Sequence, residues 1–437
     1  MNDKGRLTAA STPSGAATPA ASEIGTIVII GAGLAGAKAA EALRKETYAG
    51  RIVMFGDETH APYLRPPLSK EYLRGESEPD AALVHPRAWY EEQRIELNPG
   101  APVRAIRAAA REVVLADGQR LGFDRLLITT GAAPRRLSIP GSELEGLHYL
   151  RTMEDADAIR AAAGSASRAV VVGGGWIGAE VAASLRQLGL PVALIAPDSV
   201  PLERVLGPEV GAVYRDLHAE HGVELVTGQR AVAFHGRNRV ESVETADGAR
   251  IDGDLVVVGV GAQPQVQLAA EAGIDVDDGI VVDESLETSV AGIFVAGDVA
   301  SAWHPLLEVR LRVEHWDNAR RQGRAAARNM LGMAEPYERI PYFYSDQYDL
   351  SMEYAGFARD WDRVVVRGDL AGRTFVAFWL RDGRVVAGMN ANVQKLNGAI
   401  TALVASRRPV DVGRLVDPAV PLEDLGALLS ESGAAAS

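Results

Sequence analysis

The sequence predicts an α/β protein with two Rossmann-like dinucleotide-binding domains and a small α+β domain at the C-terminal end. Two glycine-rich turns of the same build, GAGLAG at 31–36 and GGGWIG at 173–178, each follow an apolar run and precede a helical pattern. At 437 residues, the chain exceeds the size at which one hydrophobic core usually stops growing. From about residue 334, short β-rich runs replace the alternation of strands and helices.

The first domain begins with a complete βαβ pattern. The β-branched run 26–30 enters the first glycine turn, residues 34–45 are rich in Ala and Leu, and 51–55 form the next apolar strand. In such a unit the helix N-terminus faces a pyrophosphate, and an acid after the second strand accepts hydrogen bonds from a ribose. Asp57 stands at that place. Further strands are expected at 113–115, 125–129 and 292–295.

The same pattern starts again in the second domain. Residues 169–172 lead into the second glycine turn, and 192–195 form the following strand. The helix between them is predicted to bury one face, formed by Ile177, Val181, Leu185 and Leu188. Further buried strands are expected at 223–226 and 255–260. The repetition indicates that the chain binds two dinucleotides.

These patterns divide the chain into three domains and a tail. We expect a discontinuous first domain, a second domain between its two parts and a third domain at the end, at 25–148 with 267–333, at 149–266 and at 334–437. In the third domain, strands are expected at 364–366, 374–379 and 384–386. Asp382-Gly383 predicts a hairpin turn. Residues 1–24, rich in Ala, Ser, Thr, Pro and Gly, are predicted to be disordered.

The composition excludes several kinds of chemistry. The net charge of -13 argues against general affinity for nucleic acids, which depends on clustered Lys and Arg. The chain has no Cys, so a disulfide, a Cys-ligated metal or iron–sulfur centre and a redox-active dithiol are all excluded. Electron chemistry must therefore use a non-covalent cofactor. No apolar run has membrane-spanning length, so a cytoplasmic location is expected.

The segment 62–70, PYLRPPLSK, has an unusual composition. Its adjacent prolines hold the backbone extended and would point Arg65 and Lys70 in fixed directions. From the spacing alone, ordinary solvated side chains are favoured over a binding site for these two charges.

Four motifs, taken together, resemble those of the FAD-dependent ferredoxin reductases that serve oxygenases. They are PYLRPPLSK at 62–70, TTGAAPR at 129–135, GIFVAGDV at 292–299 and VEHW at 313–316. They occur in the order found in that family, and the similarity extends from Thr26 to the end of the chain. Apoptosis-inducing factor is a more distant relative. The resemblance implies a glutathione-reductase-like arrangement of the two dinucleotide-binding domains.

The resemblance implies tightly bound FAD in the first domain. Asp57 would hold the adenosine ribose, Val103 the adenine end and Asp298 the ribityl or diphosphate portion. The full set of residues implied for FAD is Gly31, Ala32, Gly33, Leu34, Ala35, Gly36, Asp57, Arg65, Lys70, Val103, Thr130, Gly131, Arg151, Gly297, Asp298 and Trp316. Glu314, in the VEHW motif, is implied as a further cofactor-binding residue.

NAD(H) is implied as the co-substrate of the second domain. The residues that would bind it are Gly173, Gly175, Trp176, Ile177, Gly178, Glu180, Asp198, Val260 and Gly261. Many relatives place an acid at the position of Ala196, where it accepts the ribose 2′-hydroxyl; here Asp198 follows two residues later. Arg204 nearby could attract a 2′-phosphate instead. NADH is favoured over NADPH, and no metal site is expected.

Three residues are candidates for the catalytic site. By resemblance, Lys70 lies beside flavin N5, Glu180 pairs with Lys70, and Trp316 faces the isoalloxazine ring. Such charges would tune the flavin without covalent participation. The alternative for Glu180 is stabilisation by the helix dipole alone, and for Trp316 and Tyr344 it is core packing. Tyr344 stands where many relatives have Trp.

The implied reaction is hydride transfer from nicotinamide C4 to flavin N5, followed by one-electron transfer to an iron–sulfur ferredoxin that serves a cytochrome P450 or another oxygenase. An acidic ferredoxin needs a local basic patch, which is predicted near Arg310, Arg312 and Arg320. Arg324 and Arg328 continue this series at helical spacing, and a solvated helix face is the alternative. A monomer or weak dimer is expected. Two other functions remain open: a redox sensor like apoptosis-inducing factor, and a reductase of quinones or other small acceptors.

Overall fold

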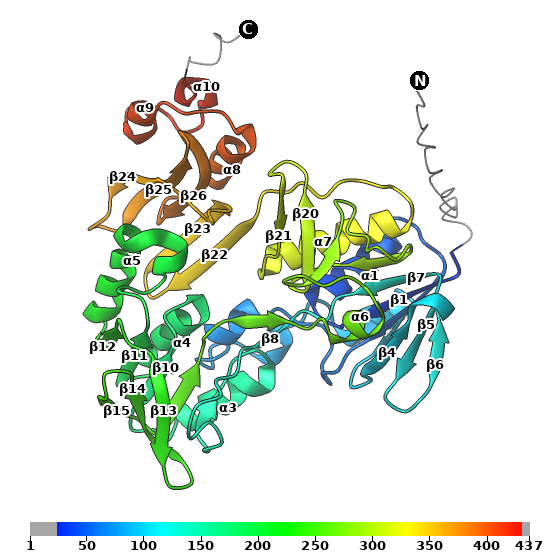
Figure 1. Ribbon diagram of the computed structural model, residues 1–437, viewed down its shortest axis with the longest axis horizontal. Coiled ribbons are helices and arrows are strands. Elements are labelled where there is room, and N and C mark those ends of the chain that lie inside the picture. The colour runs from blue at the N-terminus through cyan, green and yellow to red at the C-terminus, as the bar shows by residue number, and fades with distance from the viewer. Residues whose placement is uncertain (1–23, 431–437) are drawn as a thin grey trace, which may run out of the picture.

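The computed structural model describes residues 24–430. The predicted disordered tail, residues 1–24, lies outside this range except for its last residue. In Figure 1 we describe the chain in three parts: a first domain, which includes the blue and cyan segments, a green second domain, and an orange and red C-terminal domain. Among residues 24–430, no helix is long and apolar enough to cross a membrane.

The first domain is built on a parallel five-stranded sheet. Its strand order is β19-β7-β1-β2-β3, with bounds Ile293–Val295, Arg125–Ile128, Thr26–Ile30, Arg51–Phe55 and Ile95–Asn98. β19 pairs with β7 in this sheet, although the strands of the second sheet lie between them in the sequence. The expected strand 113–115 lies in β5, within a separate antiparallel sheet of β4, β5 and β6 (Val103–Arg107, Glu112–Leu115 and Arg120–Gly122).

The first glycine turn connects β1 to helix α1 (Leu34–Lys45). Gly31 has a φ of 110°, and a Cβ there would lie 2.2 Å from the Thr129 carbonyl oxygen. A Cβ at Gly36 would lie 2.3 Å from the Gly31 carbonyl oxygen. Only glycine allows the helix to begin this close to the sheet.

The second domain repeats this architecture. Its parallel sheet has the order β12-β11-β10-β16-β9, with bounds Val223–Thr227, Val192–Ala196, Ala169–Val172, Leu255–Val258 and Leu147–His148. β9 therefore joins the second sheet just before the expected boundary at residue 149. The antiparallel sheet β13-β14-β15 (Ala231–Gly236, Val240–Thr245 and Arg250–Asp252) is added to this domain.

Helix α4 (Trp176–Gln187) follows the second glycine turn, and its predicted buried face is only partly right. Val181 and Leu185 are fully buried, whereas Ile177 is 46% exposed and Leu188 is 37% exposed. Leu188 is the C-cap, just beyond the end of the helix, and Ile177 lies in the first helical turn. The apolar face of α4 is therefore buried in the middle of the helix and exposed at both ends.

The two domains are joined where the chain crosses between them. β8 (Ala132–Pro134) pairs with β17 (Ala262–Pro264), and helix α3 (Met153–Ala163) follows the first crossing. Thr130 Oγ1 donates to the Gln265 carbonyl oxygen over 2.8 Å, and Gln265 Nε2 donates to the Thr130 carbonyl oxygen over 2.7 Å. The reciprocal bonds hold the two crossing segments together.

The C-terminal domain contains an antiparallel sheet with the order β22-β23-β26-β25-β24. The strand bounds in that order are Tyr342–Gln347, Leu350–Gly356, Arg384–Ala391, Thr374–Arg381 and Arg363–Asp369. The three strands predicted from the sequence lie within β24, β25 and β26. Asp382 and Gly383 form the expected hairpin turn, with φ values of 50° and 70°.

This C-terminal sheet is covered on both faces. One face packs against helix α5 (Glu203–Glu220) of the second domain, where Trp379 Nε1 donates to the Leu206 carbonyl oxygen over 3.2 Å. The other face packs against helix α8 (Asn397–Ser406), followed by α9 (Val412–Val416) and α10 (Leu425–Leu428). The sheet is therefore fixed to the nucleotide-binding part of the chain through α5.

Helix α7 (Trp316–Met330) packs closely against α1. A Cβ at Gly323 would lie 2.2 Å from the Ala35 carbonyl oxygen, which explains the glycine there. Arg324 lies 3.7 Å from Glu41, and Arg328 pairs with Glu46, both on or just after α1. The arginines predicted to form a solvated or docking face therefore also make ion pairs between the two helices.

Glu41, on helix α1, makes the stability of the protein depend on pH. Burial raises the pKa of Glu41, but hydrogen bonds from Lys38, Lys45 and His85 outweigh burial and lower it to about 2. Because this folded-state pKa lies below the ordinary value of 4.5, the stabilisation is present above pH 4.5 and is lost as the pH falls toward 2. Glu41→Gln should lower the free energy of unfolding at pH 7 and flatten its decline in that range. Denaturant unfolding at several pH values measures both effects, and parallel curves for the two proteins would contradict the prediction.

Candidate active site

The two nucleotide-binding helices begin in the same way. Gly33 and Gly175 are the N-caps of α1 and α4, and no side chain within residues 24–430 caps either helix. A Cβ at either glycine would meet no protein atom within 4 Å. The backbone N–H groups of both first turns are thus available to an anion, and these residues fit the pyrophosphates of two dinucleotides.

The second turn approaches β10 and the end of β16 as closely as the first turn approaches its own sheet. A Cβ at Gly173, where φ is 115°, would lie 2.3 Å from the Gly259 carbonyl oxygen, and one at Gly178 would lie 1.9 Å from the Gly173 carbonyl oxygen. Val260 and Gly261, predicted as nucleotide contacts, follow Gly259 directly. Gly259 itself was missed, because nothing in the sequence marks it as a neighbour of the turn.

An acid follows the second strand at the same position in both nucleotide-binding domains. The Gly31 N–H donates to Phe55, and the Gly173 N–H donates to Ile195, so Glu58 and Asp198 occupy equivalent positions, three residues past the strand contact. Asp57, predicted for the ribose, is exposed beside Glu58.

Ala196, which replaces the acid found in many relatives, is buried against the second turn. A Cβ at Gly174 would lie 2.8 Å from the Ala196 Cβ. The first domain has the reverse arrangement, with the alanine, Ala32, in the turn and the glycine, Gly56, after the strand. A Cβ at Gly56 would lie 2.6 Å from the Ala32 Cβ. Asp198 lies beyond this contact and is paired with Arg204 over 3.1 Å.

A second group of predicted residues gathers around Arg65. Arg65 Nη2 donates to Glu58 Oε1 over 2.6 Å, and its Nη1 donates to the Arg151 carbonyl oxygen. Arg151 Nη2 lies 2.7 Å from Asp298 Oδ2 and 3.4 Å from where a Cβ of Gly131 would be. Burial lowers the pKa of Arg65, but Tyr63 and Glu58 outweigh it and raise the pKa above its ordinary value. Glu58 was missed from the sequence, because the adjacent Asp57 carried the expected motif.

Lys70 and Glu180 form a buried ion pair between the two domains. Lys70 follows the 3₁₀ turn Pro66–Ser69, and its Nζ lies 2.8 Å from Glu180 Oε2 on helix α4. Ser69 Oγ donates to the same oxygen over 2.5 Å. Lys70 is 9% exposed and Glu180 5%. Glu180 is therefore held by specific partners, and the helix dipole alone does not account for it.

Aromatic side chains from α7 and β22 lie beside this pair. The rings of Trp316 and Tyr344 are 6.1 Å apart, and Lys70 Nζ lies 5.7 Å from the centre of the Tyr344 ring. Burial, Asp346 and Glu180 raise the pKa of Tyr344 to about 12. Trp316 Nε1 is buried and has no hydrogen-bond partner within residues 24–430. A buried donor of this kind fits a polar cofactor edge, as expected for a flavin.

His315 connects these aromatic residues. It caps helix α7 with its Nδ1, which accepts from the Asp317 N–H over 3.3 Å. Burial lowers the pKa of His315 to about 4, against the opposing effect of Asp317. The ring is therefore neutral at pH 7, which its role as an acceptor requires.

Other predicted residues lie away from the Lys70–Glu180 pair. The Val103 side chain is 8% exposed and belongs to the core of the first domain. A contact between Val103 and an adenine would therefore use its backbone atoms. Glu314 is exposed and paired with Arg312. Gly297 donates its N–H to Gln322 over 2.9 Å, which fixes the turn that carries Asp298.

The predicted docking charges Arg310 and Arg312 are largely used inside the protein, which corrects the sequence-based expectation. Arg310 Nη1 donates to the carbonyl oxygens of Val282 and Ser301 over 2.7 and 2.6 Å. Arg312 lies 3.1 Å from Asp278 and also pairs with Glu314. Arg310 lies on β21 (Val309–Leu311), and its acceptors belong to β18 (Ile280–Val282) and β20 (Ala300–His304). The spacing of arginines in the sequence does not show these partners.

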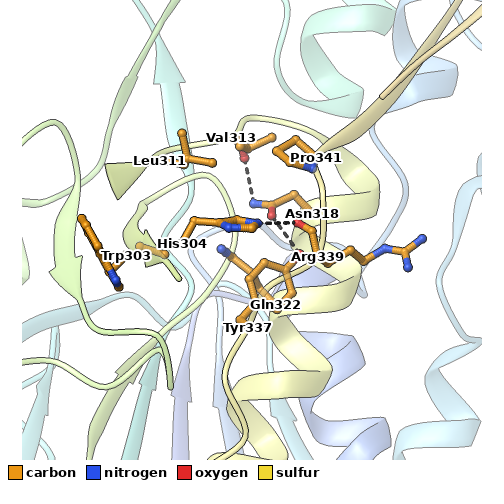
Figure 2. Close-up of a pocket in the computed structure, with 10 residues that line it drawn as sticks. Trp303, His304, Leu311, Val313, Asn318, Gln322, Tyr337, Arg339 and Pro341 are labelled. Atoms are coloured by element: carbon orange, nitrogen blue, oxygen red, sulfur yellow. Dashed lines mark hydrogen bonds between the residues drawn. The ribbon is translucent and has the colours of Figure 1, made fainter. Parts of the chain in front are cut away.

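Two cavities lie outside the predicted site. Figure 2 shows the smaller one, beside α7, where Asn318 bonds to Val313 and Tyr337, and His304 bonds to the Arg339 carbonyl oxygen. Its volume of about 10 Å³ is close to that of a single water. The larger one, about 450 Å³, lies between β21 and the C-terminal domain. Neither is lined by a residue predicted to bind a nucleotide.

The fold and the site together define a reductase of the class that binds two dinucleotides on separate Rossmann-like domains. The model of the pyridine nucleotide-disulphide oxidoreductase family matches residues 25–323, and the reductase C-terminal model matches residues 342–426. The chain belongs to the pyridine nucleotide-disulphide oxidoreductase family and carries the reductase C-terminal domain. The disulphide in the family name has no counterpart here, because the chain has no Cys.

Similar proteins confirm the resemblance inferred from the motifs. Putidaredoxin reductase of Pseudomonas putida is 37% identical over 405 residues, 91% of this chain and 96% of the relative. The ferredoxin–NAD(+) reductase component of the anthranilate 1,2-dioxygenase system of Burkholderia cepacia is 41% identical over 400 residues, 91% of this chain and 98% of the relative. The reductase in the covalent putidaredoxin reductase–putidaredoxin complex matches with a TM-score of 0.89 and 37% identity, over 92% of this chain and 98% of that one.

Proposed function

We propose that this protein is an FAD-containing, NADH-dependent ferredoxin reductase that supplies electrons to an oxygenase. The buried Lys70–Glu180 pair carries the proposal, because it joins the two dinucleotide-binding domains at one point. The relatives support it, since they are named as ferredoxin reductase components of oxygenase systems. The chain has no Cys for a dithiol relay, so electrons must leave directly for an external acceptor.

The residues of the chain would divide the work as follows. The N–H groups after Gly33 bind the FAD diphosphate, while Arg151 and Asp298 hold its polar groups near the domain crossing. Lys70, fixed by Glu180, places a positive charge beside the ring system, and Trp316 and Tyr344 limit access of water. When bound, FAD supplies the chemistry that accepts a hydride from NADH and releases electrons one at a time.

We favour NADH because an acid, Asp198, follows the second strand of the second domain, where the ribose of the dinucleotide is expected. A carboxylate accepts a hydrogen bond from the ribose 2′-hydroxyl and repels a 2′-phosphate. The ion pair with Arg204 weakens the repulsion, but the Asp198 side chain is still 30% exposed. The cytoplasmic location and the monomeric or weakly dimeric state stay predictions.

Anaerobic rapid-mixing experiments test the function. The purified protein should show flavin absorption, be reduced faster by NADH than by NADPH, and then be reoxidised by an added iron–sulfur ferredoxin. Fast reoxidation by quinones with none by any ferredoxin would contradict the proposal and favour a small-acceptor reductase. Slow turnover with every acceptor, together with a long-lived reduced complex, would favour a redox sensor.

For the ferredoxin we propose docking beside Trp316, where basic residues surround a buried acid. Asp317 is 3% exposed and is paired with Arg320, with Arg321 over 3.4 Å and with Arg339 over 3.5 Å. Three positive charges on one negative charge leave a local positive surface on a chain of net charge -13. Such a surface attracts an acidic partner next to the site.

Charge reversal at Arg321 tests this docking surface. Arg321→Glu should slow ferredoxin reduction about tenfold at low ionic strength and weaken its dependence on salt, because electrostatic attraction mainly raises the association rate. Reduction of ferricyanide by NADH should change little. Arg104→Glu, at an exposed position on β4, is the matched control and should behave like the unchanged protein. An equal effect of both substitutions on ferredoxin reduction would rule out docking beside Trp316.

A further inference from the structure

A buried row of hydrogen bonds runs from Glu180 into the C-terminal domain. Ser345 Oγ donates to Glu180 Oε1 over 2.7 Å, and Gln347 Nε2 donates to Ser345 Oγ over 3.3 Å. His218 Nε2 lies 3.0 Å from Gln347 Oε1. The exposed fractions of Glu180, Ser345, Gln347 and His218 are 5%, 2%, 1% and 0%. Two alternate residues of β22 therefore link helix α4 to helix α5.

The chemistry of each group sets the direction of these bonds. A carboxylate only accepts, so the Ser345 hydroxyl gives its one proton to Glu180. Its oxygen must then accept from the NH₂ group of Gln347, which leaves the Gln347 carbonyl to accept from His218 Nε2–H. Burial lowers the pKa of His218 to about 4, so the ring is neutral and carries its single proton on Nε2. Every donor in the row is oriented toward Glu180.

The row is costly for a purely structural contact. His218 Nδ1 is buried without a hydrogen-bond partner within residues 24–430. An unsatisfied buried polar atom destabilises a protein, and an apolar side chain in this interface would avoid the penalty. The surrounding interface between α5 and the C-terminal sheet is formed mainly by apolar side chains, such as Leu206, Met352 and Ala387.

The two oxygens of Glu180 are held by different parts of the chain. Oε2 accepts from Lys70 and Ser69 of the first domain. Oε1 accepts from Ser345 of the C-terminal domain. Without the bond to Ser345, the carboxylate could rotate about its last side-chain bond, because that torsion has a broad energy minimum. Lys70 would then lose a fixed partner.

We propose that Ser345, Gln347 and His218 are positioning residues that fix the Glu180 carboxylate and, through it, the Lys70 ammonium. The effect on a flavin rests on the proposed function, whereas the row itself does not. The C-terminal domain thereby controls the placement of a charge that belongs to the other two domains.

Ser345→Ala and Gln347→Leu test the proposal in the full-length, FAD-loaded protein. Both should shift the flavin reduction potential and its visible absorption spectrum. Both should also lower the rate of flavin reduction at saturating NADH about tenfold, while the KM for NADH changes less than about twofold. In ¹⁵N-histidine NMR spectra, Gln347→Leu should replace the single His218 Nε2–H tautomer by a mixture, because the acceptor is lost.

Two further variants separate positioning from general damage. Ser345→Thr keeps the hydroxyl and should restore the potential and the rate. Arg363→Gln changes an exposed residue on β24 of the same sheet and should resemble the unchanged protein in every measurement. An unchanged potential and rate in both Ser345→Ala and Gln347→Leu would overturn the proposal. A protein that binds no flavin would instead contradict the proposed function, and the histidine spectra would still decide whether the row forms.

Discussion

Replacing Lys70 with methionine is expected to lower the free energy of unfolding by about 3 kcal/mol at pH 7. The change leaves the Glu180 carboxylate, which is 5% exposed, without the ammonium 2.8 Å away. Methionine has a similar length, so a cavity contributes little. Flavin reduction by NADH should slow about 100-fold, or about 2.7 kcal/mol, because the fixed charge beside the ring is lost. Urea unfolding and stopped-flow absorbance measure the two effects.

Two controls separate stability from reactivity. The double substitution of Lys70 by Met and Glu180 by Gln should recover most of the stability, because no unpaired buried charge is left. It should not recover the reduction rate, because the positive charge of Lys70 is still missing from the site. Lys38→Met removes the lysine of another buried ion pair, 2.7 Å from Glu41 on α1, and should leave the reduction rate unchanged. If Lys70→Met were reduced as fast as the unchanged protein, Lys70 would have no role in the reaction.

Gly178→Ala should abolish measurable reduction by NADH while FAD remains bound. Its Cβ would lie 1.9 Å from the Gly173 carbonyl oxygen, so helix α4 must move away from β10. Glu180 lies two residues further along this helix and would move with it. We expect a loss of at least about 100-fold in reduction rate and a lower melting temperature. The flavin absorption of the purified protein and its stopped-flow reduction measure the outcome.

Gly175→Ala is the matched control in the same turn. Its φ is -79°, and its Cβ would meet no protein atom within 4 Å, so stability should not change. The methyl group would instead stand where a pyrophosphate approaches the helix, and the KM for NADH should rise about tenfold. An unchanged KM would show that the dinucleotide does not lie on this turn.

The sequence predicted the local features of the fold well. The two glycine turns, the strands beside them and the hairpin at Asp382-Gly383 depend on neighbouring residues, so their patterns are visible in the chain. The apolar face of α4 was wrong at Ile177, because a periodic pattern does not show where the covering sheet ends.

Residues of the site could be predicted only where they belong to a recognisable sequence motif. Lys70 and Glu180 were paired through the resemblance, since no spacing rule joins residues 110 positions apart. Ser345, Gln347 and His218 were missed, because an isolated Ser, Gln or His has no signature until the fold brings its partners together. Arg310 was misjudged for the same reason: the carbonyl oxygens that bind it belong to other strands. The roles assigned to individual residues stay predictions until they are tested.

The hydrogen bonds of Glu180 also constrain how the protein is made. Its partners Lys70 and Ser345 lie 110 and 165 residues away in the sequence, on either side of it. During synthesis, the carboxylate cannot acquire its full set of partners until residue 345 has left the ribosome. Contacts between such distant segments also close late in folding, because the entropy of ordering the intervening chain opposes them. A nascent chain therefore carries both nucleotide turns well before it carries a complete site.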